Sequence, residues 1–137
     1  MVIRMDKKID VVALGELLID FTESGISNQG NQLLEVNPGG APCNVLSMLS
    51  NLGKRTAFIG KVGIDTSNLV IDDETHTTLA FVHTLEDGDR EFSFYRNPGA
   101  DMMLRKEEVN EELIRNARMF HFGTLSSTHA LVREATR

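Results

Sequence analysis

Short apolar runs that stop at glycine alternate with one helical run in the first half of the chain. Residues 9–14 are mostly apolar and β-branched and stop at Gly15, which is typical of a strand buried on both faces of a parallel sheet. Residues 45–52 carry apolar side chains at helical spacing and stop at Gly53, which predicts a buried helix with a glycine-rich entrance. Residues 56–60 repeat the strand pattern. This order of elements predicts an α/β layered architecture.

A hairpin is predicted further along the chain. Residues 77–84 and 91–96 are rich in β-formers and are joined by a segment with an Asp-Gly step, which indicates a hairpin loop longer than two residues. Because strand side chains alternate, Phe92, Phe94 and Arg96 are predicted to share one face. The sequence therefore predicts an aromatic sheet face that ends in a guanidinium.

The remaining segments are assigned from the same two periodicities and from polar, glycine-containing stretches. They are a loop at 24–32, a short strand at 33–36, an amphipathic helix at 106–117, a strand at 119–123 and a helix that begins at 127.

Composition limits the chain to one packed unit. It has 137 residues, of which 41% are hydrophobic, and this allows one core but not two complete domains. Fourteen Lys and Arg against 20 Asp and Glu give a net charge of −6, and the basic residues are scattered. We therefore expect neither a nucleic acid nor an anionic membrane as a partner.

The cysteine content and the absence of long apolar runs indicate the compartment. Cys43 is the one cysteine of the sequence, so no internal disulfide can form, and this favours a reducing compartment. No stretch approaches the roughly 20 apolar residues of a membrane span, and the amino end does not have the pattern of a secretory signal. We expect a soluble, cytoplasmic protein.

Several standard motifs are absent from the sequence. It contains no Gly-x-Gly-x-x-Gly, and Gly60-Lys61 lacks the rest of a phosphate-binding P-loop. The histidines show no paired spacing with acidic neighbours, so no metal site is expected. Ser126-Ser127 lacks the glycine elbow of a serine nucleophile.

A polar set around two glycines is the strongest candidate for chemistry. Asp20 ends an apolar run, where an unpaired carboxylate is costly to bury, so it should face solvent, cap a turn or bind a ligand. Gly39 and Gly40 precede a helix whose first turn carries Asn44, a side chain with both a donor and an acceptor. On these residues alone, a tight loop followed by a polar helix start is an equally good interpretation.

Five segments of the chain resemble one family. Gly15-Glu-Leu-Leu-Ile-Asp20, Asn37-Pro-Gly-Gly-Ala-Pro-Cys-Asn-Val45 and Ala57-Phe-Ile-Gly-Lys-Val-Gly63 resemble the amino-terminal half of the PfkB/ribokinase family of sugar kinases. Residues 90–104, with the sequence Arg-Glu-Phe-Ser-Phe-Tyr-Arg-Asn-Pro-Gly-Ala-Asp-Met-Met-Leu, and residues 119–123 are similar to the fructokinase branch.

The resemblance implies a fold and an activity. The fold is a ribokinase-like three-layer α/β/α sandwich with a small β-sheet lid built from residues 33–36 and 77–96. The activity is transfer of the γ-phosphoryl group of ATP, with Mg²⁺, to a sugar hydroxyl, with D-fructose to fructose 6-phosphate as the first expectation. Separately, the apolar residues Leu79, Phe81, Phe92 and Phe94 of the hairpin lead us to expect that the lid packs on the sugar, on the lid of a partner in a homodimer, or on both. The substrate-binding residues implied are Asp20, Gly39, Gly40, Asn44, Tyr95 and Arg96.

The family pattern is incomplete in this sequence. The Gly-Ala-Gly-Asp motif that carries the family's catalytic base has no counterpart, and Asp101 belongs to a different motif. The helix that the family carries after the position of Gly63 is also missing, although a parallel strand pair needs a crossover of about a dozen residues. We expect residues 1–137 to be the amino-terminal part of one ribokinase-like domain. The catalytic base and the ATP site would then lie outside this chain, which would be inactive alone.

Two other functions remain open at this stage. A kinase of the same fold that acts on 2-keto-3-deoxygluconate would use Tyr95 and Arg96 to meet the substrate carboxylate. A non-catalytic module that binds a sugar or mediates dimerisation belongs to a different functional class.

Overall fold

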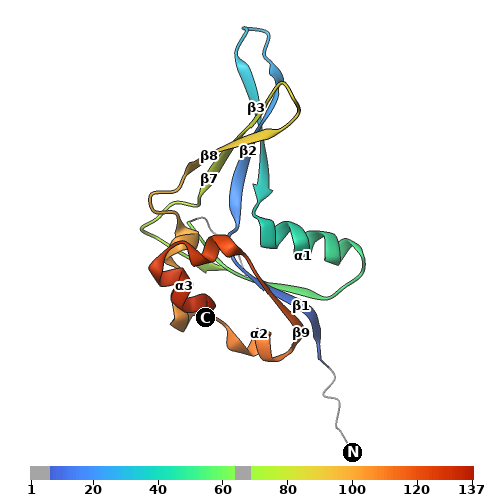
Figure 1. Ribbon diagram of the computed structural model, residues 1–137, viewed down its shortest axis with the longest axis vertical. Coiled ribbons are helices and arrows are strands. Elements are labelled where there is room, and N and C mark those ends of the chain that lie inside the picture. The colour runs from blue at the N-terminus through green and yellow to red at the C-terminus, as the bar shows by residue number, and fades with distance from the viewer. Residues whose placement is uncertain (1–6, 64–68) are drawn as a thin grey trace, which may run out of the picture.

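A three-stranded parallel sheet forms the body of the molecule (Figure 1). The computed structural model describes residues 7–63 and 69–137. Strand β1 (Ile9–Leu14) lies between β4 (Thr56–Ile59) and β9 (Ala117–Phe122) and runs parallel to both. All three strands match those predicted, with β9 beginning two residues earlier. The central strand β1 has apolar residues on both faces, so each face of the sheet must be covered by other elements.

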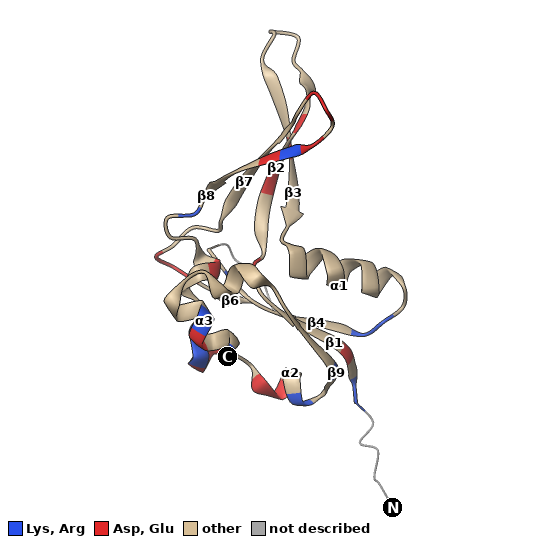
Figure 2. Ribbon diagram, viewed as in Figure 1, with Lys and Arg blue, Asp and Glu red and all other residues tan. Residues whose placement is uncertain are grey.

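A second sheet of four strands projects from the body as a lid (Figure 1). Its order is β3 (Gln32–Gly39), β2 (Leu18–Ile26), β7 (Leu79–Thr84) and β8 (Arg90–Tyr95), and only the β2–β7 pairing is parallel. The predicted hairpin is present as β7 and β8, and its turn is mostly acidic (Figure 2). The loop predicted at 24–32 is shorter than expected, because β2 and β3 both extend into it around a register shift after Glu23.

Strand alternation divides the lid side chains between two faces. Phe92 and Phe94 lie opposite Val82 and Ala80 on one face. Phe81 lies on the other face, where its ring stacks on Phe21 with the ring centroids 5.1 Å apart. Both faces of this single-layer sheet therefore carry apolar side chains.

Helix α1 (Ala41–Asn51) covers one face of the body sheet. Its Leu46 is buried against Val11 and Ala13 of β1. The predicted helix is therefore confirmed, and its inner face meets the inner face of β1. Each such buried aliphatic side chain contributes about 1.5–3 kcal/mol relative to an exposed one.

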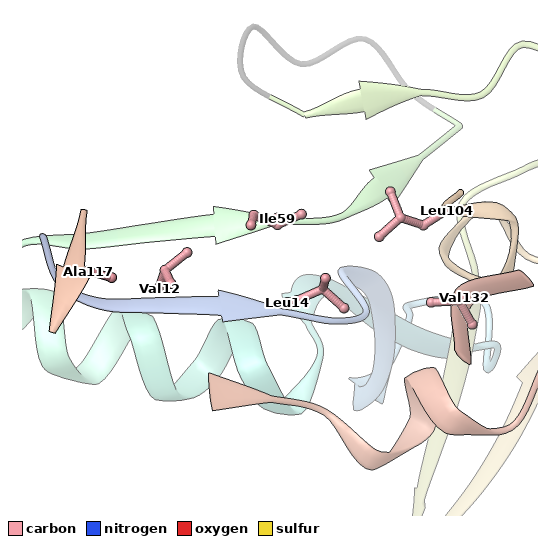
Figure 3. Packing of buried hydrophobic residues seen from close by; sticks show 6 residues of the cluster. All are labelled: Val12, Leu14, Ile59, Leu104, Ala117 and Val132. Carbon is pink, nitrogen blue, oxygen red and sulfur yellow. The ribbon is translucent and has the colours of Figure 1, made fainter. Parts of the chain in front are cut away.

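The opposite face of the body sheet packs on the carboxyl-terminal elements. Val12 and Leu14 of β1 belong to one buried cluster with Ile59, Leu104, Ala117 and Val132, in which Val12 lies toward Ala117 and Leu14 lies toward Val132 (Figure 3). Leu104 follows the 3₁₀ helix η1 (Ala100–Met103), and Val132 lies in α3 (Ala130–Thr136). Helices on both faces of a parallel sheet confirm the predicted α/β/α layers.

The helix predicted over 106–117 is wrong as a single element. The structure has a 3₁₀ helix η2 (Lys106–Glu108), then α2 (Glu111–Arg115), and Ala117 already belongs to β9. The interruption has a local cause, because Asn110 caps α2 by accepting a hydrogen bond from the Glu112 amide at 3.1 Å. Helix α3 also begins later than predicted, after a 3₁₀ helix η3 (Thr124–Ser127).

A two-stranded parallel pair lies beside the body sheet. It consists of β5 (Lys61–Val62) and β6 (Val70–Ile71). Lys61 is buried, and its ammonium group lies 3.1 Å from the Asp72 carboxylate and 2.9 Å from that of Glu108. The junction at which the sequence lacks an expected helix falls at residues 64–68, outside the described residues.

A buried ion pair connects the end of the lid to the body. Arg96, just after β8, donates to Asp101 Oδ2 from Nε at 3.0 Å and from Nη2 at 2.5 Å. The Thr78 hydroxyl donates to Asp101 Oδ1 at 2.5 Å. Asp101 is only 4% exposed, so its carboxylate is neutralised by protein groups rather than by water.

Removing the Asp101 carboxylate should therefore destabilise the intact protein. We expect Asp101→Ala to lower the free energy of unfolding by about 3–5 kcal/mol, because it leaves the buried Arg96 guanidinium without a counter-charge. Urea unfolding provides the measurement. Arg115→Ala, which removes an ion pair between exposed side chains, is the control and should cost about 1 kcal/mol or less. Equal losses in the two variants would contradict the structural role of Asp101.

Candidate functional site

A cavity of about 400 Å³ lies where the lid meets the body. This volume is typical of small-molecule sites, which span about 300–1,000 Å³. Its lining comes from the root of the lid, the start of α1, the β7–β8 hairpin and η3. The lining residues are Glu16, Leu18, Asp20, Thr22, Gly40, Ala41, Asn44, Val82, Arg90, Phe92, Phe94 and Leu125.

Asp20 presents a carboxylate to this cavity from β2. It is partly buried, and burial raises its pKa above the usual 3.8. Its side chain makes no hydrogen bond to any residue in the described part of the chain. A partly buried carboxylate without a protein partner is placed to accept hydrogen bonds from the hydroxyls of a ligand.

The two glycines before α1 create the space that this arrangement needs. A Cβ at Gly39 would lie 2.2 Å from Asp20 Oδ2, so a side chain there would displace the carboxylate. Gly40 has φ +114°, and a Cβ would lie 2.3 Å from the Glu16 carbonyl oxygen. Any residue with a side chain would therefore be strained at position 40 and would disturb the start of α1.

Glu16 supports the start of α1 from the end of β1. Its Oε1 accepts a hydrogen bond from the Ala41 amide at 3.1 Å, which satisfies one of the free N–H groups of the helix. Its Oε2 is buried and has no hydrogen-bond partner among the described residues. Burial raises the pKa of this carboxyl, and the nearby Asp101 carboxylate adds to the rise.

Asn44 lies in the first turn of α1, and its side chain is exposed toward the cavity. Its backbone amide donates to the Gly40 carbonyl at 2.9 Å, so the position of the residue is fixed by the helix itself. The amide side chain can then both donate to and accept from a ligand hydroxyl.

Aromatic rings cover the cavity from the lid side. Phe92 and Phe94 stack with their centroids 6.1 Å apart, and they are 49% and 52% exposed. Exposed phenyl rings beside a polar cavity provide an apolar surface for the carbon face of a small polar ligand.

The structure brings together only part of the predicted site. Asp20, Gly40 and Asn44 line one cavity, and Gly39 lies against Asp20 without lining it. Tyr95 is on the opposite face of β8, and Arg96 is held by Asp101, so neither side chain lines the cavity. Contact between these six residues and a substrate stays a prediction.

Two charged lining residues, Glu16 and Arg90, are missing from the predicted set. Glu16 belongs to the same motif as Asp20. An acidic residue directly before an apolar run could have marked it as a candidate site residue. Arg90 lies two positions before Phe92, so the alternation of strand side chains would have placed it on the same face.

The cavity does not suit a nucleotide triphosphate, and the described residues offer no cluster for its metal. They contain no group of three or more His, Cys, Asp or Glu side chains placed to hold a metal ion. The cavity itself carries the carboxyl groups of Asp20 and Glu16, which would repel a polyphosphate. Among the described residues, no helix has both the length and the hydropathy to cross a bilayer.

The raised pKa of Glu16 predicts a pH-dependent difference in stability. A carboxyl whose pKa is higher in the folded than in the unfolded state adds most to the free energy of unfolding when the pH lies below its unfolded pKa. This added stability is lost as the pH rises through the folded pKa. Glu16→Gln removes that loss and keeps an acceptor for the Ala41 amide. The unfolding free energy of the variant, relative to the unmodified protein, should therefore rise between pH 4 and pH 7. A difference that is constant over this interval would contradict the prediction.

Comparisons with known proteins agree on one family. The family model described as pfkB family carbohydrate kinase matches residues 8–136. The probable fructokinase-2 of Arabidopsis thaliana is 46% identical over 139 residues, which cover 88% of this chain and 42% of that protein. Fructokinase-1 of Zea mays is 43% identical over 134 residues, covering 85% of this chain and 42% of that protein. The chain thus spans less than half the length of these relatives.

Solved structures show the same relationship. The crystal structure of fructokinase from Xylella fastidiosa aligns with a TM-score of 0.82 and 30% identity, covering 96% of this chain and 45% of that one. The same enzyme with bound ATP aligns with a TM-score of 0.79 and 30% identity, covering 96% and 44%. The ribokinase-like fold class predicted from the sequence is therefore confirmed. With a family model that matches nearly its whole length, this chain belongs to the pfkB family of carbohydrate kinases.

Proposed function

We propose that the intact protein phosphorylates D-fructose to fructose 6-phosphate with ATP, and that this chain supplies the sugar-binding part. The observation that carries the proposal is the free carboxylate of Asp20 in a cavity that also presents the Asn44 amide. Sugar hydroxyls both donate and accept hydrogen bonds, so a carboxylate and an amide on one wall can orient them. The fructokinase names of the relatives support the choice of sugar.

The lid supports a transfer reaction rather than simple binding. Phosphoryl transfer to a sugar competes with transfer to water, so the reacting hydroxyl must be kept apart from bulk solvent. The apolar face formed by Phe92 and Phe94 lies over the cavity and would exclude water once a sugar is bound. This feature favours a kinase over a non-catalytic sugar-binding module.

ATP, Mg²⁺ and the catalytic base belong, in this proposal, to the intact protein beyond the described residues. The ATP complex of the Xylella fastidiosa enzyme supports ATP as the phosphoryl donor. ATP would supply the phosphoryl group, and Mg²⁺ would neutralise its developing charge. The residues of this chain would orient the sugar and exclude water.

A kinase acting on 2-keto-3-deoxygluconate has less support. That function needs a cation to meet the substrate carboxylate, and Arg96 was expected to provide it. The Arg96 guanidinium is only 12% exposed and is already bound by Asp101. The cavity carries two acidic side chains, Asp20 and Glu16, against one basic side chain, Arg90, and this balance favours a neutral sugar over an anionic one.

Replacing the Asp20 carboxylate should impair turnover of fructose. We expect Asp20→Asn to lower kcat/KM for D-fructose by roughly 30- to 1,000-fold, because a charge-assisted hydrogen bond that positions the sugar is worth about 2–4 kcal/mol. Steady-state kinetics of the intact protein provide the measurement. Asp73→Asn, at an exposed position outside the cavity, is the matched control. An unchanged kcat/KM in Asp20→Asn would refute the assignment of Asp20.

We also propose that the intact protein is a cytoplasmic homodimer that associates through the lid. The lid face opposite the cavity carries Phe21 stacked on Phe81, with Val36 and Tyr95 beside them at 60% and 64% exposure. A contiguous apolar sheet face of this kind favours a protein partner, and a second lid has the same composition. The single free cysteine, Cys43, is consistent with a reducing compartment.

A charge placed on this outer lid face should prevent association. We expect the intact protein to sediment as a dimer at micromolar concentration and Val36→Asp to sediment as a monomer, because a carboxylate would be desolvated in the interface. Met48→Asp is the control, since Met48 on α1 is equally exposed at 62% but lies away from the lid. A monomeric unmodified protein would rule out the dimer.

A further inference from the structure

Arg90 adds a cation to the lining of the cavity. It is the first residue of β8 and lies opposite Thr84, two residues before Phe92 on the same face of the strand. The cavity is lined by Arg90 together with Phe92, Phe94 and, from β2, Thr22. The register of the hairpin therefore aims this side chain at the cavity rather than at the outer face of the lid.

The guanidinium of Arg90 has no partner within the described part of the chain. Acidic residues surround it in sequence, and Figure 2 shows the acidic turn beside the basic start of β8. Its backbone amide donates to Asp89 Oδ1 at 2.8 Å, but its side chain makes no hydrogen bond or ion pair with described residues. Arg96, just after the other end of the same strand, donates to Asp101 Oδ2 from Nε and Nη2 and to Thr128 Oγ1 from Nη1. Of these two guanidinium groups, that of Arg90 is therefore the one without a partner among residues 7–63 and 69–137.

The charges of the cavity are complementary to a polyhydroxylated ligand. Ionised Asp20 and Glu16 can only accept hydrogen bonds, whereas the guanidinium of Arg90 can only donate them. A sugar hydroxyl needs both kinds of partner. The carboxylate of Asp20 lies at the root of the lid and Arg90 lies at its outer part, so a ligand between them can meet an acceptor and a donor at separate hydroxyls.

We propose that Arg90 is a further sugar-binding residue, whose guanidinium donates hydrogen bonds to hydroxyl oxygens of a neutral sugar held by Asp20. This inference rests on the proposed sugar kinase function and adds a donor to its binding site. The rigid fork of the guanidinium suits two neighbouring oxygens, which makes Arg90 a determinant of which sugar configuration fits. Because Arg90 has no other side-chain partner among the described residues, replacing it should leave the folded structure intact.

The test measures D-fructose binding and turnover by variants of the intact protein. We expect Arg90→Gln to weaken D-fructose binding in titration calorimetry by roughly 10- to 100-fold, the range expected for a hydrogen bond to a charged group. KM should rise more than kcat falls, and the melting temperature should not change. Arg90→Lys keeps the charge without the fork and should recover part of the affinity. Arg133→Gln, at an exposed position on α3, is the control.

The possible results separate this inference from the proposed function. If Arg90→Gln binds D-fructose as tightly as the unmodified protein while Asp20→Asn does not, the role of Arg90 is refuted and the sugar site stands. If the unmodified protein binds no D-fructose, both proposals fail. If it prefers 2-keto-3-deoxygluconate and Arg90→Gln abolishes that preference, Arg90 meets a carboxylate, and the inference of a neutral ligand is overturned.

Discussion

The close approach of Glu16 to residues 40 and 41 is the contact on which the site depends. The chain leaves the body sheet after Gly15, enters the lid as β2, and returns through β3 to the start of α1. At the return, Gly40 lies against the Glu16 carbonyl, and the Ala41 amide donates to the Glu16 side chain. The outgoing and returning segments are thus fixed to each other where lid and body meet. The positions of Asp20 and Asn44, each a few residues from this contact, follow from it.

The body of the fold could be predicted because its signals are local. Residues 9–14 and 56–59 form strands whose apolar pattern alone identifies them, and α1 has both a helical period and glycines at its ends. The error at residues 106–117 has a local part, the cap at Asn110, and a non-local part. The apolar spacing continues across Asn110, but Ala117 pairs with Ile9, more than a hundred residues earlier in the chain, and this pairing takes the segment into β9. The helical spacing of apolar residues carries no information about a strand pairing with a distant part of the chain.

The candidate site divides in the same way. Asp20, Gly40 and Asn44 lie in short motifs, and the structure places all three on one cavity. The interpretation of Arg96 depended on strand alternation, but β8 ends at Tyr95 and the next side chain turns to Asp101. That turn is set by a buried carboxylate that needs the guanidinium for neutralisation, an energetic demand that outweighs the periodicity of an exposed strand end. Side chains alternate between the two faces of a sheet only as far as the strand stays paired with its neighbour.

The lid is a sheet with one layer and with apolar side chains on both faces, so its position must be fixed at its edges rather than by a core. β2 and β3 connect it to the body through the Glu16 contact, and the Arg96–Asp101 ion pair fixes the end of β8. Between these attachments the phenyl rings of Phe92 and Phe94 stay about half exposed. Covering them is favourable by about 25 cal/mol for each Å² removed from water, so a ligand that contacts them in the cavity would gain binding free energy. The exposed apolar area of these two rings would therefore contribute to the free energy of ligand binding.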